Sequence, residues 1–64
     1  MFTAYVTTKA GKITLFAMPS KRRDVEETAA KMSKMPDVER VSVAAYGRII
    51  ATFREGVRID SETR

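Results

Sequence analysis

The chain has 64 residues, a formal net charge of +4, and neither cysteine nor histidine. This length predicts a single domain over residues 1–64, in which residues 55–64 form either a frayed tail or a short additional strand. The composition excludes disulfides, thiolate metal sites and histidine-based catalysis. The excess of basic over acidic residues favours a polyanionic partner or an acidic protein surface.

The beginning of the chain has no basic segment followed by an apolar run, so no signal peptide is expected. No apolar stretch approaches the length that a bilayer requires. We therefore expect a cytoplasmic protein that does not associate with membranes.

Residues 2–9 and 12–18 alternate between apolar and polar side chains and are rich in the residue types that strands prefer. A two-residue turn at Ala10 and Gly11 would pair Val6 with Leu15 and would place all apolar partners of the two strands on one face. Because a shift by one residue moves the whole side-chain set of a strand to the other face, this agreement predicts the register.

Residues 20–35 predict a helix, with apolar side chains at helical spacing at Val25, Ala29 and Met32. Two starting points remain open. Ser20 can cap a helix that has three cations in its first turn, or Asp24 can be the cap with Glu27 as its capping-box partner. Pro36 predicts the end of the helix, because the residue before a proline avoids the α conformation.

Residues 39–45 and 48–55 alternate again and predict a second hairpin. A three-residue loop from Tyr46 to Arg48 would pair Ala45 with Ile49 and keep the apolar side chains of both strands on one face. A two-residue turn at Tyr46 and Gly47 would mix apolar and polar sets, so the longer loop is preferred.

These elements predict an α+β fold of order ββαββ, with a four-stranded, mainly antiparallel sheet and one helix packed on one face. The helix would cross over so that the third strand lies beside the first, which gives the order 2-1-3-4. The expected core beneath the helix consists of Phe2, Ala4, Val6, Ile13, Leu15, Ala17, Val41, Val43, Ala45, Ile49, Ala51 and Phe53.

The face without a helix is the most informative prediction, because it combines cations and aromatic rings without any acidic residue. Tyr5 and Phe16 should lie opposite each other there, as a platform on which bases stack. The candidate nucleic-acid-binding residues are Tyr5, Lys9, Lys12, Phe16, Lys21, Arg22, Arg23, Arg40, Arg48 and Arg54. The same face is rather apolar for open solvent, and its candidate interface residues are Tyr5, Phe16, Met18 and Ile50.

The sequence therefore predicts a small, non-enzymatic nucleic-acid-binding protein, DNA or RNA, that forms a homodimer. The alternative is a protein-interaction module or small inhibitor, in which the same face binds a partner or a second copy. No catalytic residue, cofactor or metal site is expected, since the acidic residues do not gather on one strand face and no phosphate-cradling glycine loop is present.

Overall fold

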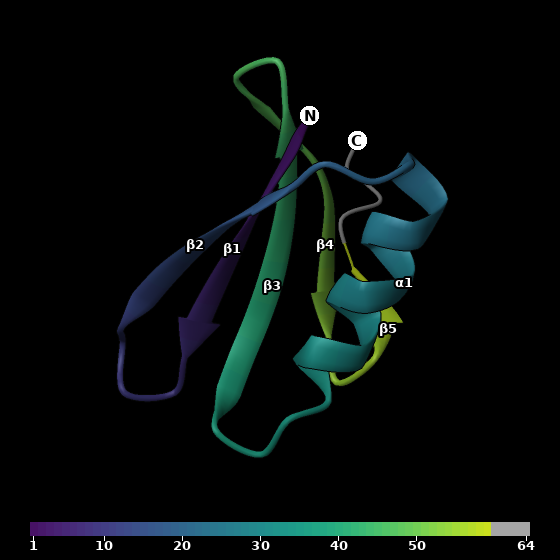
Figure 1. Cartoon of the computed structure of the whole chain (residues 1–64). Coiled ribbons are helices and arrows are strands. Elements are labelled where there is room, and N and C mark those ends of the chain that lie inside the picture. The colour runs from purple at the N-terminus through teal and green to yellow at the C-terminus, as the bar shows by residue number, and fades with distance from the viewer. Residues whose placement is uncertain (60–64) are drawn as a thin grey trace.

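A computed structural model describes residues 1–59, which form one helix on one side of an antiparallel sheet of five strands (Figure 1). The sheet has the order β2-β1-β3-β4-β5. The elements are β1 (Phe2–Thr8), β2 (Ile13–Met18), α1 (Arg22–Ser33), β3 (Val38–Ala45), β4 (Arg48–Arg54) and β5 (Val57–Arg58).

The α+β class, the ββαββ order of the first four strands and their arrangement 2-1-3-4 agree with the sequence analysis. The sheet differs in having a fifth strand, β5, which pairs with β4 through Arg54 and Val57. The short additional strand is therefore the correct reading of residues 57–58, whereas residues 60–64 lie outside the described part of the chain.

The predicted register of the first hairpin is wrong by one residue. Tyr5 pairs with Leu15, and Ala4 pairs with Phe16. Four residues, Lys9 to Lys12, join the strands. The amide of Thr8 donates to the carbonyl of Lys12 (2.8 Å), which closes a loop of three residues, and the last of these, Gly11, has a φ of +87°. The amide of Gly11 donates to the carbonyl of Thr8 (2.9 Å), as in three-residue loops that end on a left-handed glycine.

The second hairpin has the shorter turn that the sequence analysis rejected. Tyr46 and Gly47 both have positive φ, 52° and 78°, which is the conformation of the tightest hairpin turns. Val43 still pairs with Ala51 as predicted, but the register shifts beyond this pair, so that Ile49 lies opposite Ala44. A bulge in β4 therefore reconciles the short turn with the apolar pattern of the strand centres.

The helix begins at Arg22, and neither predicted cap is used. Lys21 is the N-cap residue, and it makes no side-chain capping hydrogen bond. Arg22 and Arg23 thus occupy the first turn, where Asp24 offsets their charge. Arg22 also reaches one turn along the helix to Glu26, at 2.7 Å.

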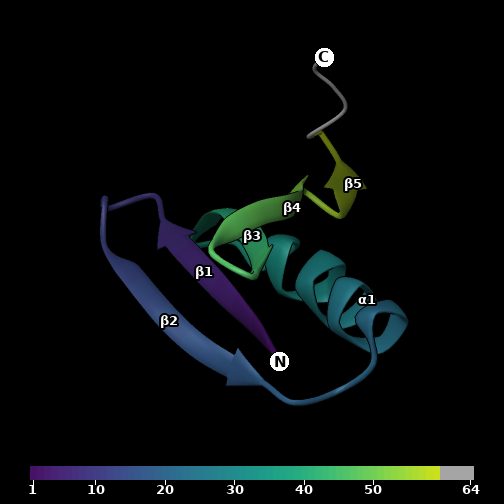
Figure 2. The ribbon, with the colours of Figure 1, turned by 90° about the horizontal axis from the view of Figure 1, so that it is seen from above.

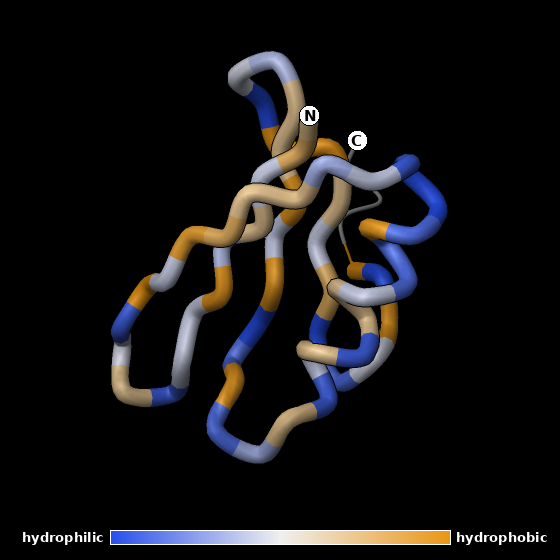
Figure 3. The backbone as a smooth tube through the Cα atoms, viewed as in Figure 1, coloured by the Kyte–Doolittle hydropathy of each residue, from blue (hydrophilic) through white to orange (hydrophobic). Residues whose placement is uncertain are grey.

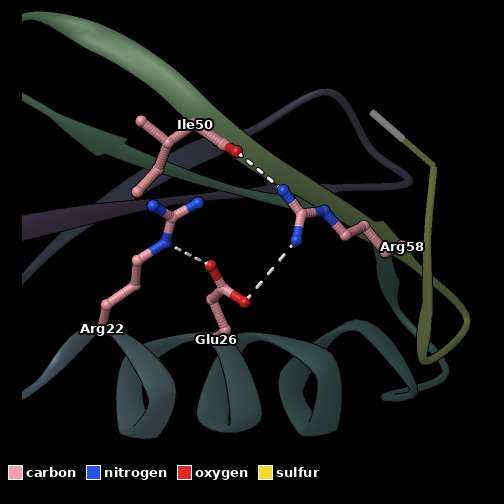
Figure 4. A network of polar contacts seen from close by, with 4 residues as sticks. All are labelled: Arg22, Glu26, Ile50 and Arg58. Atoms are coloured by element: carbon pink, nitrogen blue, oxygen red, sulfur yellow. Dashed lines mark hydrogen bonds and ion pairs between the residues drawn. The ribbon is translucent and has the colours of Figure 1, made fainter. Parts of the chain in front are cut away.

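Glu26 links the helix to the far edge of the sheet (Figure 4). Its second carboxylate oxygen lies 3.7 Å from the guanidinium of Arg58 in β5, and that guanidinium also donates to the carbonyl of Ile50 (3.2 Å). Glu26 therefore lies between two arginines, one from the helix and one from the sheet. The arrangement holds Arg22 at the helix surface, away from the opposite sheet face.

The core lies between α1 and the centre of the sheet. Its buried side chains are Ala4, Val6, Val25, Ala29, Val38, Val41, Val43, Ala51 and Phe53. Four predicted core residues are instead on the opposite face, because the two registers differ from the prediction: Ile13, Leu15, Ala17 and Ile49. Phe2, Met18, Met32 and Ile50 pack at the margin of this core.

Candidate functional site

The sheet face opposite α1, called the open face here, is built from residues that alternate with the buried ones. Partners in an antiparallel ladder lie on the same face, so the registers assign its members. They are Thr3, Tyr5, Thr7, Ile13, Leu15, Ala17, Arg40, Ser42, Ala44, Ile49, Thr52 and Arg54.

A shallow hollow of about 320 Å³ lies in the open face, across β2, β1, β3 and the start of β4. It is lined by Tyr5, Thr7, Ile13, Arg40, Ser42, Ala44, Gly47, Arg48 and Ile49. No acidic residue lines the hollow.

The two arginines lie toward opposite ends of the hollow. Arg40 pairs with Thr7 near the beginning of β3, whereas Arg48 pairs with Ala45 at its end. Arg40 and Ala45 are five steps apart along β3, which corresponds to roughly 17 Å at the usual strand rise. Tyr5 lies between them, opposite Ser42 and half-buried.

Both arginines are exposed, and within residues 1–59 neither has a carboxylate partner. Arg54, further along β4, differs because its guanidinium lies 2.7 Å from the carboxylate of Glu39. The expectation of a face without acidic neighbours therefore holds for the hollow but not for Arg54. The unpaired positive charge that lines the hollow is therefore that of Arg40 and Arg48.

The predicted aromatic pair does not exist. Tyr5 is on the open face, but Phe16 pairs with Ala4 and so projects from the helix side of the sheet, where it is 46% exposed. Met18 and Ile50 also lie on the helix side, where they pack against the core. The four candidate interface residues therefore do not form one surface.

The remaining predicted cations divide between two regions. Lys9 and Lys12 belong to the exposed loop between β1 and β2, which is continuous with the Thr7 end of the hollow. The cluster of Lys21, Arg22 and Arg23 begins the helix on the opposite side of the sheet (Figure 2). It cannot extend the basic surface of the open face.

Three aliphatic residues that sequence reasoning assigned to the core are exposed here. Ile13, Leu15 and Ile49 expose 58–59% of their surface on the open face. The signal that could have located Ile13 and Leu15 is Gly11, since a glycine at the third loop position is typical of three-residue hairpin loops.

Comparisons with protein-family models, with curated proteins and with solved structures found no match to this chain. Among residues 1–59 no helix is both long and apolar enough to cross a membrane.

Proposed function

We propose that this chain is a non-enzymatic protein that binds single-stranded nucleic acid in the hollow of its open face. The observation that carries the proposal is a hollow with an arginine toward each end, a tyrosine between them and no carboxylate in its lining. Such a site suits a ligand that is anionic along its length and has flat apolar groups between the charges.

Each part of a nucleotide has a complementary group in the hollow. The phenol ring of Tyr5 offers a surface for one unpaired base, which is a sequence-tolerant contact. The guanidiniums of Arg40 and Arg48 can contact phosphates on either side, and the hydroxyls of Thr7 and Ser42 can accept or donate hydrogen bonds. Lys9 and Lys12 lie where a nucleic-acid strand that leaves the hollow at its Thr7 end would continue.

The shape favours a single strand over a duplex. Tyr5 is half-buried between β2 and β3, so its ring is reached only by a group that enters the hollow. The bases of a duplex are stacked inside it, whereas those of a single strand can be splayed out onto an aromatic ring.

The test is fluorescence anisotropy with a labelled oligothymidine at several salt concentrations. Replacing Tyr5 by alanine should cost about 1–3 kcal/mol, or roughly 5- to 150-fold in affinity. Arg40→Gln and Arg48→Gln should each reduce the slope of log affinity against log salt by about 0.7.

Arg23→Gln is the matched control, because it removes the same charge from the other side of the molecule. It should leave the affinity nearly unchanged. Absence of binding at low salt would refute the proposal. Equal losses for Arg23→Gln and Arg40→Gln would show attraction by net charge alone, without a site.

A protein partner with an acidic surface is the second candidate, favoured by the exposed aliphatic residues Ile13 and Ile49 in the lining of the hollow. Ile49→Lys separates the two functions. The added cation should maintain or strengthen oligonucleotide binding, whereas it should weaken a contact that buries the isoleucine in a protein interface.

A further inference from the structure

We propose that two copies of this chain associate through the free edge of β2, so that their sheets join in antiparallel orientation across a two-fold axis at Leu15. The contact shares Ile13 with the lining of the hollow, but it does not depend on a ligand bound there. It also differs from the face-to-face dimer that the sequence suggests, because backbone hydrogen bonds carry it.

The two edges of the sheet are protected very differently. β5 is an edge of two residues and ends on a charged side chain, Arg58. β2 is six residues long, ITLFAM, with no charge, proline, glycine or bulge, and five of its residues are exposed. Short length, charged residues, proline and bulges normally prevent edge-to-edge pairing of strands, and β2 has none of these. Within residues 1–59 no other element covers the outer side of β2, and the strand itself has no hydrophilic segment (Figures 2 and 3).

The hydrogen bonding of the first hairpin determines which backbone groups of β2 are free. The amide of Thr8 donates to the carbonyl of Lys12 at 2.8 Å. Because hydrogen-bonded and non-hydrogen-bonded pairs alternate in an antiparallel ladder, Thr14, Phe16 and Met18 also bond to β1. The amides and carbonyls of the alternate residues, Ile13, Leu15 and Ala17, therefore point away from the sheet.

These three residues form a self-complementary edge. In antiparallel pairing centred on Leu15, Leu15 meets Leu15 of the second copy, and Ile13 meets Ala17 of the second copy. Each of the three exchanges two hydrogen bonds with its partner. A shift of two residues in either direction leaves one residue of each copy unpaired, so the centred register makes the most bonds.

The side chains and charges suit the same register. On the open face, the exposed Leu15 side chains cover each other, and Ile13 packs beside Ala17 of the second copy. Lys12 lies opposite the uncharged Met18 of the second copy, whereas parallel pairing would place the two copies of Lys12 side by side. Antiparallel pairing therefore avoids an additional repulsion between two copies of a chain whose net charge is already +4.

The strength of the contact follows from its size. A pair of six-residue strands buries less than the roughly 1,200–2,000 Å² of a standard stable interface. We therefore expect a weak dimer, with a dissociation constant in about the micromolar range.

Engineered cysteines test the register directly, since the natural chain has none. Directly opposed hydrogen-bonded residues lie about 5.5 Å apart at Cα, within the range of a disulfide. Leu15→Cys should therefore form a covalent dimer under mild oxidation at least tenfold faster than Ile13→Cys. In the dimer the two copies of residue 13 lie roughly 14 Å apart. Equal rates, or no covalent dimer, would overturn the proposal.

Sedimentation equilibrium provides the second test. Leu15→Pro removes an outward amide and no bond to β1, so it should give a folded monomer, as checked by circular dichroism. Ile49→Lys is the matched control, because Ile49 has the same 59% exposure on the same face but lies on β4. It should remain dimeric. A monomeric wild type at millimolar concentration, or dimer loss only in Ile49→Lys, would contradict edge pairing.

Discussion

At the scale of single residues, Ser33 connects the end of the helix to the turn after β4 through several hydrogen bonds. It is buried at the last turn of α1, and its hydroxyl donates to the carbonyl of Ala30 at 2.7 Å. The same oxygen accepts a hydrogen bond from the amide of Gly56 (2.8 Å), and the Ser33 carbonyl accepts one from Glu55 (3.2 Å). One residue thus joins the end of the helix to the turn between β4 and β5.

Ser33→Ala should lower the free energy of unfolding by about 1–3 kcal/mol, because the Gly56 amide loses its partner in a part-buried position. Urea denaturation measures this change. Ser20→Ala is the control, and it should change the stability by less than about 0.5 kcal/mol, since Ser20 is exposed and lies before the N-cap residue. A loss of about 1 kcal/mol or more in the control would instead identify Ser20 as the cap.

At the scale of elements, the conformations of the turns determined the registers of the hairpin strands. The alternation of apolar and polar side chains could not specify these registers alone. Both side-chain sets of β2 are apolar, with Ile13 and Leu15 on one face and Phe16 and Met18 on the other. Burial therefore does not specify the register of this edge strand, as it does for Val41 and Val43 in the centre of the sheet. The strand order and the central pairings were predictable for that reason, whereas the β2 register was not.

The same distinction applies to the candidate site. Tyr5 and Arg40 could be assigned to the face away from the helix because they alternate with buried residues on central strands. Ile49 could not, since its position depends on a bulge that the sequence pattern does not show. The ion pair of Arg54 was also missed, because it depends on where Glu39 lies at the irregular start of β3.

Tyr46→Asn should stabilise the second hairpin by about 0.5–1 kcal/mol. Tyr46 has a φ of 52°, and asparagine adopts this conformation at lower cost than tyrosine. Its side chain is 98% exposed, so little packing is lost. Thermal unfolding measures the gain, and Tyr46→Val, which adds a β-branched residue at positive φ, should lower the melting temperature. If both variants behaved alike, the short turn would be the wrong description.

At the scale of the whole molecule, one helix is too small to cover the whole sheet. α1 packs on β3, β4 and β1, so β2 lies at a margin where its residues from Ile13 to Ala17 are exposed and only Met18 packs against the core (Figure 2). A chain of 64 residues buries only roughly 60% of its unfolded surface and is marginally stable alone. Pairing through β2 would add bonds and apolar contacts at the part of the fold with the least support.

This coupling of assembly to stability predicts a melting temperature that depends on protein concentration. Above the dissociation constant, each tenfold increase in concentration should add about 0.7 kcal/mol per chain, which raises the melting temperature by about 3–6 °C for a domain of this size. Differential scanning calorimetry at several concentrations measures the effect. Ile49→Lys should retain this dependence, and Leu15→Pro should melt at one temperature throughout, because a proline at the edge removes pairing without touching the core. A wild-type melting temperature that is constant across the series would mean that the folded state gains nothing from a second copy.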